Sequence, residues 1–123
     1  MTPGCDDDLI TCAHALLRAL EPDDVPSLAS IQVGTLASGI EGTTSNGVIV
    51  INKDGEIYHR GDLLALACVL HHEFQHAAKH ADERHAYIAS MNFCRRHNAP
   101  DWLVVRVRRE WCKHHQPKHE ATP

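Results

Sequence analysis

Apolar residues recur every three or four positions in four stretches of the chain, which is the spacing of one face of an α-helix. These stretches cover residues 6–20, 61–78, 82–97 and 101–114. The second is apolar nearly all round, as is typical of a helix at the centre of its domain, and Asp62 is its expected N-cap. Asn98–Pro100 ends the third helix, because proline disfavours helix at its own position and at the one before.

Two shorter stretches have the pattern of β-strands. Ser30–Leu36 alternates and is rich in β-prone residues, and Val48–Ile51 is a run of four β-branched apolar residues closed by the turn signal Asn52–Gly55. Residues 37–47, between them, are rich in glycine and threonine and predict a loop. We therefore expect an α+β fold with about four helices packed on a small β-sheet.

Length and charge narrow the class of protein. A chain of 123 residues supports one core, so we expect a single domain over residues 1–123, with residues 116–123 as a flexible polar tail. A formal net charge of -4 offers no strong attraction for nucleic acid or an anionic membrane, and neither is expected as a partner. No stretch approaches the roughly 20 apolar residues of a membrane helix. The acidic N-terminus lacks a secretory signal pattern, so a cytoplasmic protein is expected.

A candidate metal site lies in the central predicted helix. His72-Glu73-Phe74-Gln75-His76 has the form H-E-x-x-H. Residues four apart share a helical face, so His72 and His76 can bind the same ion. Glu73 lies about 100° round the helix from His72, where its carboxylate can take a proton from a metal-bound water without binding the metal. The pattern predicts a zinc-dependent hydrolase, with one Zn²⁺ per chain and Glu73 as general base.

A catalytic zinc site needs three protein ligands, and the third has three candidates. Glu83 is favoured, provided that the chain turns at Lys79–Asp82 and a second helix brings Glu83 back toward His76. Asp82 and His80 stay open as alternatives. His80 continues the series 72, 76, 80, but three histidines on a straight helix reach too far along its axis to share one ion.

The segments Leu66–Ala78 and Asp82–Tyr87 resemble the core of small zincin metallopeptidases of the gluzincin type. In that family a glutamate on the next helix completes H-E-x-x-H, so the resemblance implies Glu83 as third ligand and a peptide or protein substrate. It also implies that the strand Val48–Ile51 borders the cleft and pairs with extended substrate. Tyr87 departs from the family, whose larger members have an acidic residue there, and the short spacer after His76 requires a compact version of the fold.

A second function class stays open, a non-catalytic interaction module stabilised by zinc. Such a site would close the fourth position with protein, for example with His80 or a cysteine. Glu73 inside the motif favours catalysis, because a structural site has no use for it. So small a chain could also need a protein partner to complete its cleft.

Several side chains near the motif are expected to have ordinary roles. His71 and His85 are expected outside the site, and Tyr87 is expected to pack in the core. The polar residues of the last helix are expected to point into solvent. They are Arg106, Arg109, Glu110 and Lys113.

Overall fold

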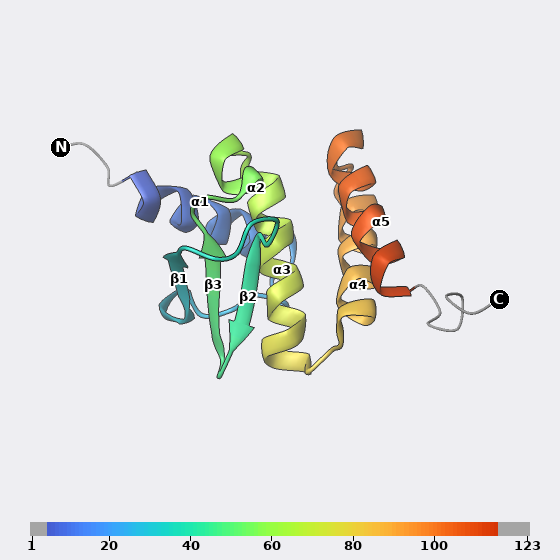
Figure 1. Ribbon diagram of the computed structural model, residues 1–123. Helices are drawn as coiled ribbons and strands as arrows, with labels where there is room; N and C mark the ends of the chain where they lie inside the picture. The colour runs from blue at the N-terminus through green and yellow to red at the C-terminus, as the bar shows by residue number, and fades with distance from the viewer. Residues whose placement is uncertain (1–4, 116–123) are drawn as a thin grey trace.

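The computed structural model describes residues 5–115, and the expected tail at 116–123 lies outside them. Five α-helices and three β-strands form the described part of the chain (Figure 1). In chain order they are α1 (Cys5–Leu20), β1 (Ile31–Gly34), β2 (Gly42–Ser45), β3 (Val48–Asn52), α2 (Glu56–Arg60), α3 (Leu63–Lys79), α4 (Glu83–Arg96) and α5 (Asp101–His115), with a 3₁₀ turn at Leu28–Ser30. The predicted α+β class, with about four helices on a small sheet, is confirmed.

The three strands form one mixed sheet in the order β1-β3-β2, in which β3 pairs parallel with β1 and antiparallel with β2. Strand β3 is therefore central, as its apolar run requires, and Ile49 and Ile51 are buried. Strand β2 is an edge strand inside residues 37–47, where the sequence predicted a loop, and that prediction was wrong. Asn46 and Gly47 both have positive φ, at 52° and 79°, and they close a two-residue hairpin between β2 and β3.

Helix α3 stands between the sheet and the pair α4–α5, while α1 packs across it (Figure 1). Its buried residues Leu66 and Leu70 meet Leu17 of α1 and Phe93 of α4 in one core. Burial of each such side chain contributes about 1.5–3 kcal/mol. The pattern that predicted a central helix was right, and this position places the H-E-x-x-H residues at the junction of sheet and helices.

Capping residues fix both ends of α3 and the start of α4. The Asp62 carboxylate begins α3 by accepting from Ala65 N at 3.0 Å. His80 ends it with a left-handed backbone (φ 54°), and Ala81 N donates back to Gln75 O at 3.1 Å. Asp82 then caps α4 by accepting from His85 N at 2.8 Å. Three residues therefore reverse the chain and place Glu83 at the start of α4.

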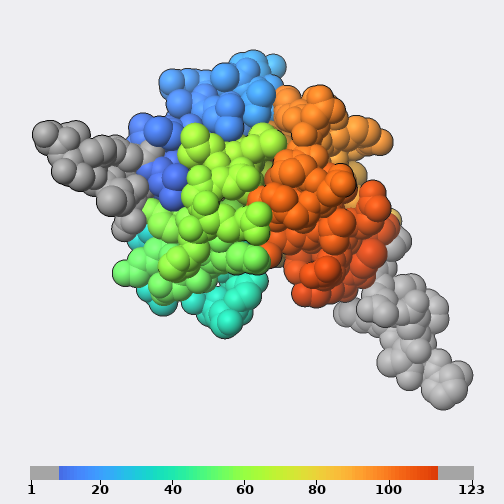
Figure 2. Space-filling model, turned by 90° about the horizontal axis from the view of Figure 1, so that it is seen from above, coloured from blue at the N-terminus to red at the C-terminus, as the bar shows by residue number. Residues whose placement is uncertain are grey.

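At the end of the molecule seen in Figure 2, α5 lies against α2. The Arg60 guanidinium lies 3.7 Å from the centre of the Trp102 ring, and Arg106 pairs with Glu56. Helix α2 was not predicted, because the predicted turn ended at Gly55 and the next predicted helix began at Gly61. Among residues 5–115, no helix combines the length and the apolar character needed to cross a membrane.

Candidate metal centre

Helices α3 and α4 bring His72, His76 and Glu83 together. Oε1 of Glu83 lies 3.0 Å from Nε2 of His72 and 2.9 Å from Nε2 of His76. Within the described residues these three form a group whose ligand atoms all lie within 4.8 Å of one another, close enough to hold one metal ion. The turn at residues 80–82 that the sequence required for Glu83 is present.

The two alternatives for the third ligand lie elsewhere. The carboxylate of Asp82 caps α4 and lies 2.6 Å from Nδ1 of His85, which is exposed as expected. His80 is the exposed C-cap of α3. Neither side chain belongs to the group that could hold an ion.

The outer nitrogen of each imidazole has a partner that accepts a hydrogen bond. Nδ1 of His76 donates to the carbonyl oxygen of Ala81 at 2.7 Å, and a carbonyl can only accept. The Ser90 hydroxyl gives its hydrogen to Ala86 O at 3.1 Å, so its oxygen accepts from Nδ1 of His72 at 3.2 Å. Because Nδ1 donates in both rings, each Nε2 faces Glu83. It donates to the carboxylate when the ring is protonated, and it presents a lone pair that can bind metal when the ring is neutral.

Nε2 of His72, Nε2 of His76 and the Glu83 carboxylate therefore face one another, and a positive charge is favoured between them. The hydrogen bond with His72 and the nearby His76 lower the pKa of Glu83 to about 2. Burial works against charge on His76, but the Ala81 carbonyl and the Glu83 carboxylate outweigh it and raise the pKa of that imidazole. A carboxylate that stays ionised, facing two imidazole nitrogens, is a donor set that attracts a cation.

Glu73 lies beside these three residues but is not one of the group. Its side chain is only 5% exposed, and its Oε1 accepts a hydrogen bond from Oγ1 of Thr44 at 2.7 Å. Burial raises the pKa of Glu73, and this effect outweighs the opposing influence of His72 and Thr44. A carboxylate with a raised pKa is a stronger base than an exposed one.

Strand β2 approaches α3 closely enough to hold Glu73 because Gly42 has no side chain. A Cβ at Gly42 would lie 3.2 Å from Val69 Cγ1 and 3.3 Å from Glu73 Cγ. Thr44, two residues along the same face of the strand, then reaches the carboxylate. Thr44 was not predicted as a site residue because strand β2 was not predicted, although Asn46-Gly47 is a strong hairpin signal.

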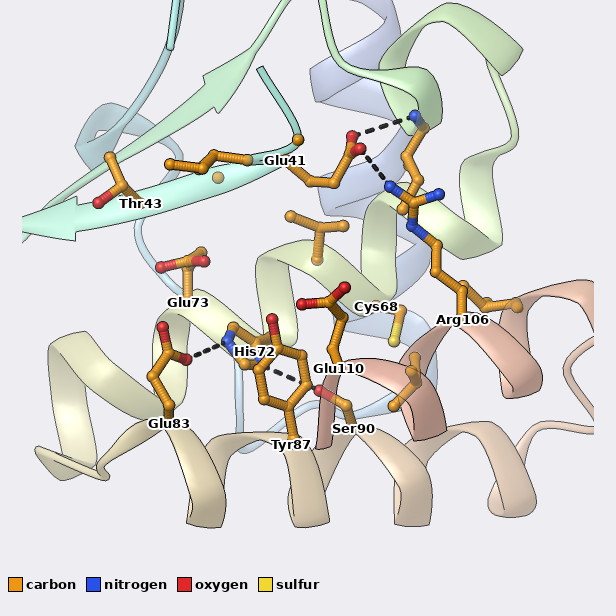
Figure 3. A pocket seen from close by; sticks show the side chains of 17 residues that line it. Glu41, Thr43, Cys68, His72, Glu73, Glu83, Tyr87, Ser90, Arg106 and Glu110 are labelled. Atoms are coloured by element: carbon orange, nitrogen blue, oxygen red, sulfur yellow. Dashed lines mark hydrogen bonds and ion pairs between the residues drawn. The ribbon is translucent and has the colours of Figure 1, made fainter. Parts of the chain in front are cut away.

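Strand β2, and not Val48–Ile51, borders the cleft. The expectation that Val48–Ile51 pairs with substrate was wrong, because β1 and β2 occupy both edges of β3. The edge strand β2 and the loop before it line a cavity of about 350 Å³ next to the candidate metal centre. Helix α3 forms its floor, and α4 and α5 form its opposite wall (Figure 3).

Two residues of α5 that were expected to point into solvent line this cavity instead. Arg106 forms ion pairs with Glu41 and Glu56 across the cleft. The carboxylate of Glu110 lies between Tyr87 and Arg106 (Figure 3). This polar face of α5 lines a cleft, and its sequence pattern does not differ from that of a helix face exposed to water. Tyr87 also lines the cavity, and its ring centre lies 4.2 Å from that of His72.

His71, which was expected on the outside, is only 1% exposed and lies on the other side of α3 against Phe93. With Glu21 and Asp24 it forms a second group that could hold an ion. Those two carboxylates already have cationic partners: Lys79 lies 2.7 Å from Asp24, and Arg96 lies 2.8 Å from Glu21. We therefore regard this second group as an ion-pair network that joins α1, α3 and α4.

The centre formed by His72, His76 and Glu83 has no such competing lysine or arginine among its hydrogen bonds and ion pairs in the described part of the chain. Comparisons of the chain with protein-family models, curated proteins and solved structures found no match. The function is therefore inferred from the geometry of the site.

Proposed function

We propose that this protein is a zinc-dependent hydrolase, a metallopeptidase of the small zincin type. Zn²⁺ would be bound by His72, His76 and Glu83, and Glu73 would be the general base. The observation that carries the proposal is that Nδ1 of each imidazole has its own acceptor, which turns both Nε2 atoms toward one oxygen of Glu83. Two imidazole nitrogens and one carboxylate are the donor set of a common class of catalytic zinc site.

The number of ligands favours catalysis over a structural role for the ion. A structural zinc site is closed by four protein ligands, whereas a catalytic one keeps a position open. Within residues 5–115 the group holds three potential ligands, and neither His80 nor a cysteine joins it. The buried carboxylate of Glu73 beside the group, outside its three potential ligands, suits a general base.

In the proposed reaction, each part of the site has a separate role. Zinc held by three protein ligands would lower the pKa of a water molecule and polarise a substrate carbonyl. Glu73, held by Thr44 through Oε1, takes the proton of the water as its oxygen attacks the carbonyl carbon. The same carboxylate then passes this proton to the leaving amine when the carbon–nitrogen bond breaks. The free edge of β2 is placed to pair with an extended peptide along the cleft.

The test is the variant Glu73→Gln, which keeps the shape of the side chain and removes the base. We expect its zinc content and thermal stability to stay close to wild type, while hydrolysis of a peptide library at neutral pH falls by about 10²- to 10⁴-fold. A chelator should abolish wild-type activity. Glu21→Gln is the matched control, since it makes the same change in the ion-pair network behind α3 and should leave zinc content and hydrolysis unchanged.

Three outcomes would contradict this assignment. If Glu73→Gln loses zinc, Glu73 is a ligand. If wild type and Glu73→Gln are equally inactive on every peptide while both need zinc to fold, the protein is a zinc-stabilised interaction module. Wild-type protein that binds no zinc on reconstitution would exclude both functions.

A further inference from the structure

The cavity beside the metal centre has mostly apolar walls and acidic groups at its end away from the ligands. Ile57 and Val69 contribute to one side of it, and Leu103 and Val107 of α5 to the other. Its volume of about 350 Å³ lies in the range of pockets that bind small molecules, roughly 300–1,000 Å³. The cavity therefore has room for one long side chain of a substrate bound at the metal centre.

The charge of the lining residues is one-sided. Four glutamates line the cavity, Glu41, Glu73, Glu83 and Glu110, and the only lysine or arginine among its lining residues is Arg106. Glu73 and Glu83 belong to the metal centre. The charge of Arg106 is compensated twice, by Glu41 and by Glu56. Glu41 is also committed, because its Oε1 accepts from Ile57 N at 3.1 Å.

Glu110 is the acidic group of the cavity that remains for a ligand. Its side chain is 32% exposed, and its carboxylate points into the cavity between Tyr87 and Arg106 (Figure 3). Lys113, its partner at 2.9 Å, is three residues along the same helix and 61% exposed. An exposed pair of this kind is worth little and is readily exchanged.

We propose that this cavity is the side-chain pocket for the substrate residue next to the cleaved bond, and that Glu110 selects lysine or arginine there. The inference rests on the proposed hydrolase function and names its substrate class. A lysine or arginine side chain has an apolar stem that suits Val69, Leu103 and Val107, and a cationic end that suits Glu110. An acidic side chain would meet the one-sided negative charge of the lining and be rejected.

A bulky apolar side chain is the main competitor, because the walls are mostly apolar. Filling the cavity with such a side chain would remove water from the Glu110 carboxylate and leave the exposed Lys113 as its partner. Removing water from a charge without supplying a new partner is unfavourable. The position of Glu110 therefore favours the basic side chain over the apolar one.

The first experiment compares peptides that differ at one position, with lysine, arginine, leucine or glutamate next to the cleaved bond. We expect kcat/KM for lysine and arginine to exceed that for leucine by on the order of ten- to a hundredfold, as for a hydrogen bond to a charged group. Glu110→Gln should remove this preference, and Glu110→Lys should shift it toward glutamate. The Glu21→Gln variant should keep the wild-type preference. Cleavage that favours leucine and does not change in Glu110→Gln would overturn the proposal and leave the hydrolase function intact.

The second experiment needs no catalysis. Binding of n-butylamine and of n-butanol, which have similar length and differ in charge, is followed by NMR in the Glu73→Gln protein and in the Glu73→Gln/Glu110→Gln protein. We expect the amine to bind at the cavity at least tenfold more tightly than the alcohol, and Glu110→Gln to abolish the difference. This result would support the pocket even if no peptide is cleaved. Equal binding of the two probes would overturn it.

Discussion

Replacing Glu83 with glutamine should change how the stability of the protein depends on pH when zinc has been removed by a chelator. The hydrogen bond with His72 and the charge of both imidazoles lower the pKa of Glu83 from 4.5 to about 2. Each unit between the folded and unfolded pKa corresponds to about 1.4 kcal/mol, which sets an upper limit of about 3 kcal/mol. The side chain is 49% exposed, and screening by solvent reduces the expected contribution to about 1–2 kcal/mol.

The sign of the effect follows from the two pKa directions. The folded pKa of Glu83 is lowered, so its contribution is complete above pH 4.5 and is lost as the pH falls toward about 2. The folded pKa of His76 is raised above 6.5, so its contribution is complete below pH 6.5 and is lost as the pH rises through the raised value. The contacts of Glu83 with the imidazoles contribute to both shifts, although the Ala81 carbonyl also raises the pKa of His76, so the difference between wild type and Glu83→Gln should be largest between about pH 4.5 and 6.5.

Urea unfolding followed by circular dichroism at pH 3, 5.5 and 8, with chelator present, measures this difference. Asp82→Asn is the matched control, because it removes the neighbouring carboxylate while asparagine still caps α4. A difference for Glu83→Gln that is the same at all three pH values would refute the close approach of Glu83 to the imidazoles. Added zinc should then stabilise wild type far more than Glu83→Gln, because ligands stabilise in proportion to their affinity for the folded state.

Two further predictions concern the roles of single side chains. Thr44→Val should leave zinc content unchanged and lower kcat by about 10- to 100-fold, because the Glu73 carboxylate loses the hydroxyl that holds Oε1. The Thr44→Ser variant, which keeps the hydroxyl, should have a kcat close to wild type. A fall in zinc content with kcat unchanged would contradict the positioning role of Thr44. Purified protein should hold about one zinc per chain. In a zinc titration, Glu83→Ala should weaken the zinc affinity by at least about 100-fold, on the order of what one of the ligands contributes to the binding free energy. His80→Ala should change the zinc affinity little.

Local sequence signals predicted much of this structure because their physics is local. Asp62 and Asp82 are helix caps whose side chains need only the backbone of the next turn, and the helices begin where these residues stand. The spacing of His72 and His76 on one helix face needs no tertiary contact either. The prediction of a buried central helix depended on periodicity alone, and Leu66 and Leu70 are fully buried.

The errors concern contacts between elements far apart in the sequence. Arg106 and Glu110 have the helical spacing of a solvated face, and only the approach of the loop at Glu41 turns that face into a cleft wall. His71 is buried because α1 and α4 cover it, which a pattern within α3 does not reveal. Thr44 reaches Glu73 across 29 positions of sequence. Each of these side chains acts through a partner that no local pattern names.

The turn between α3 and α4 explains why Glu83 could be predicted and Thr44 could not. The chain reverses at His80, Ala81 and Asp82. Two of these residues also help to position the candidate ligands. The Ala81 carbonyl orients His76, and the Asp82 carboxylate begins the helix that carries Glu83. These three residues therefore set the position of Glu83 relative to His76, and all of them lie between the two in the sequence. The base depends instead on a separate strand, so a fold could hold the metal through this turn and still lack a positioned Glu73. The proposed metal binding and the proposed hydrolysis thus depend on different elements, so the variants of Glu83 and Thr44 are expected to change different quantities.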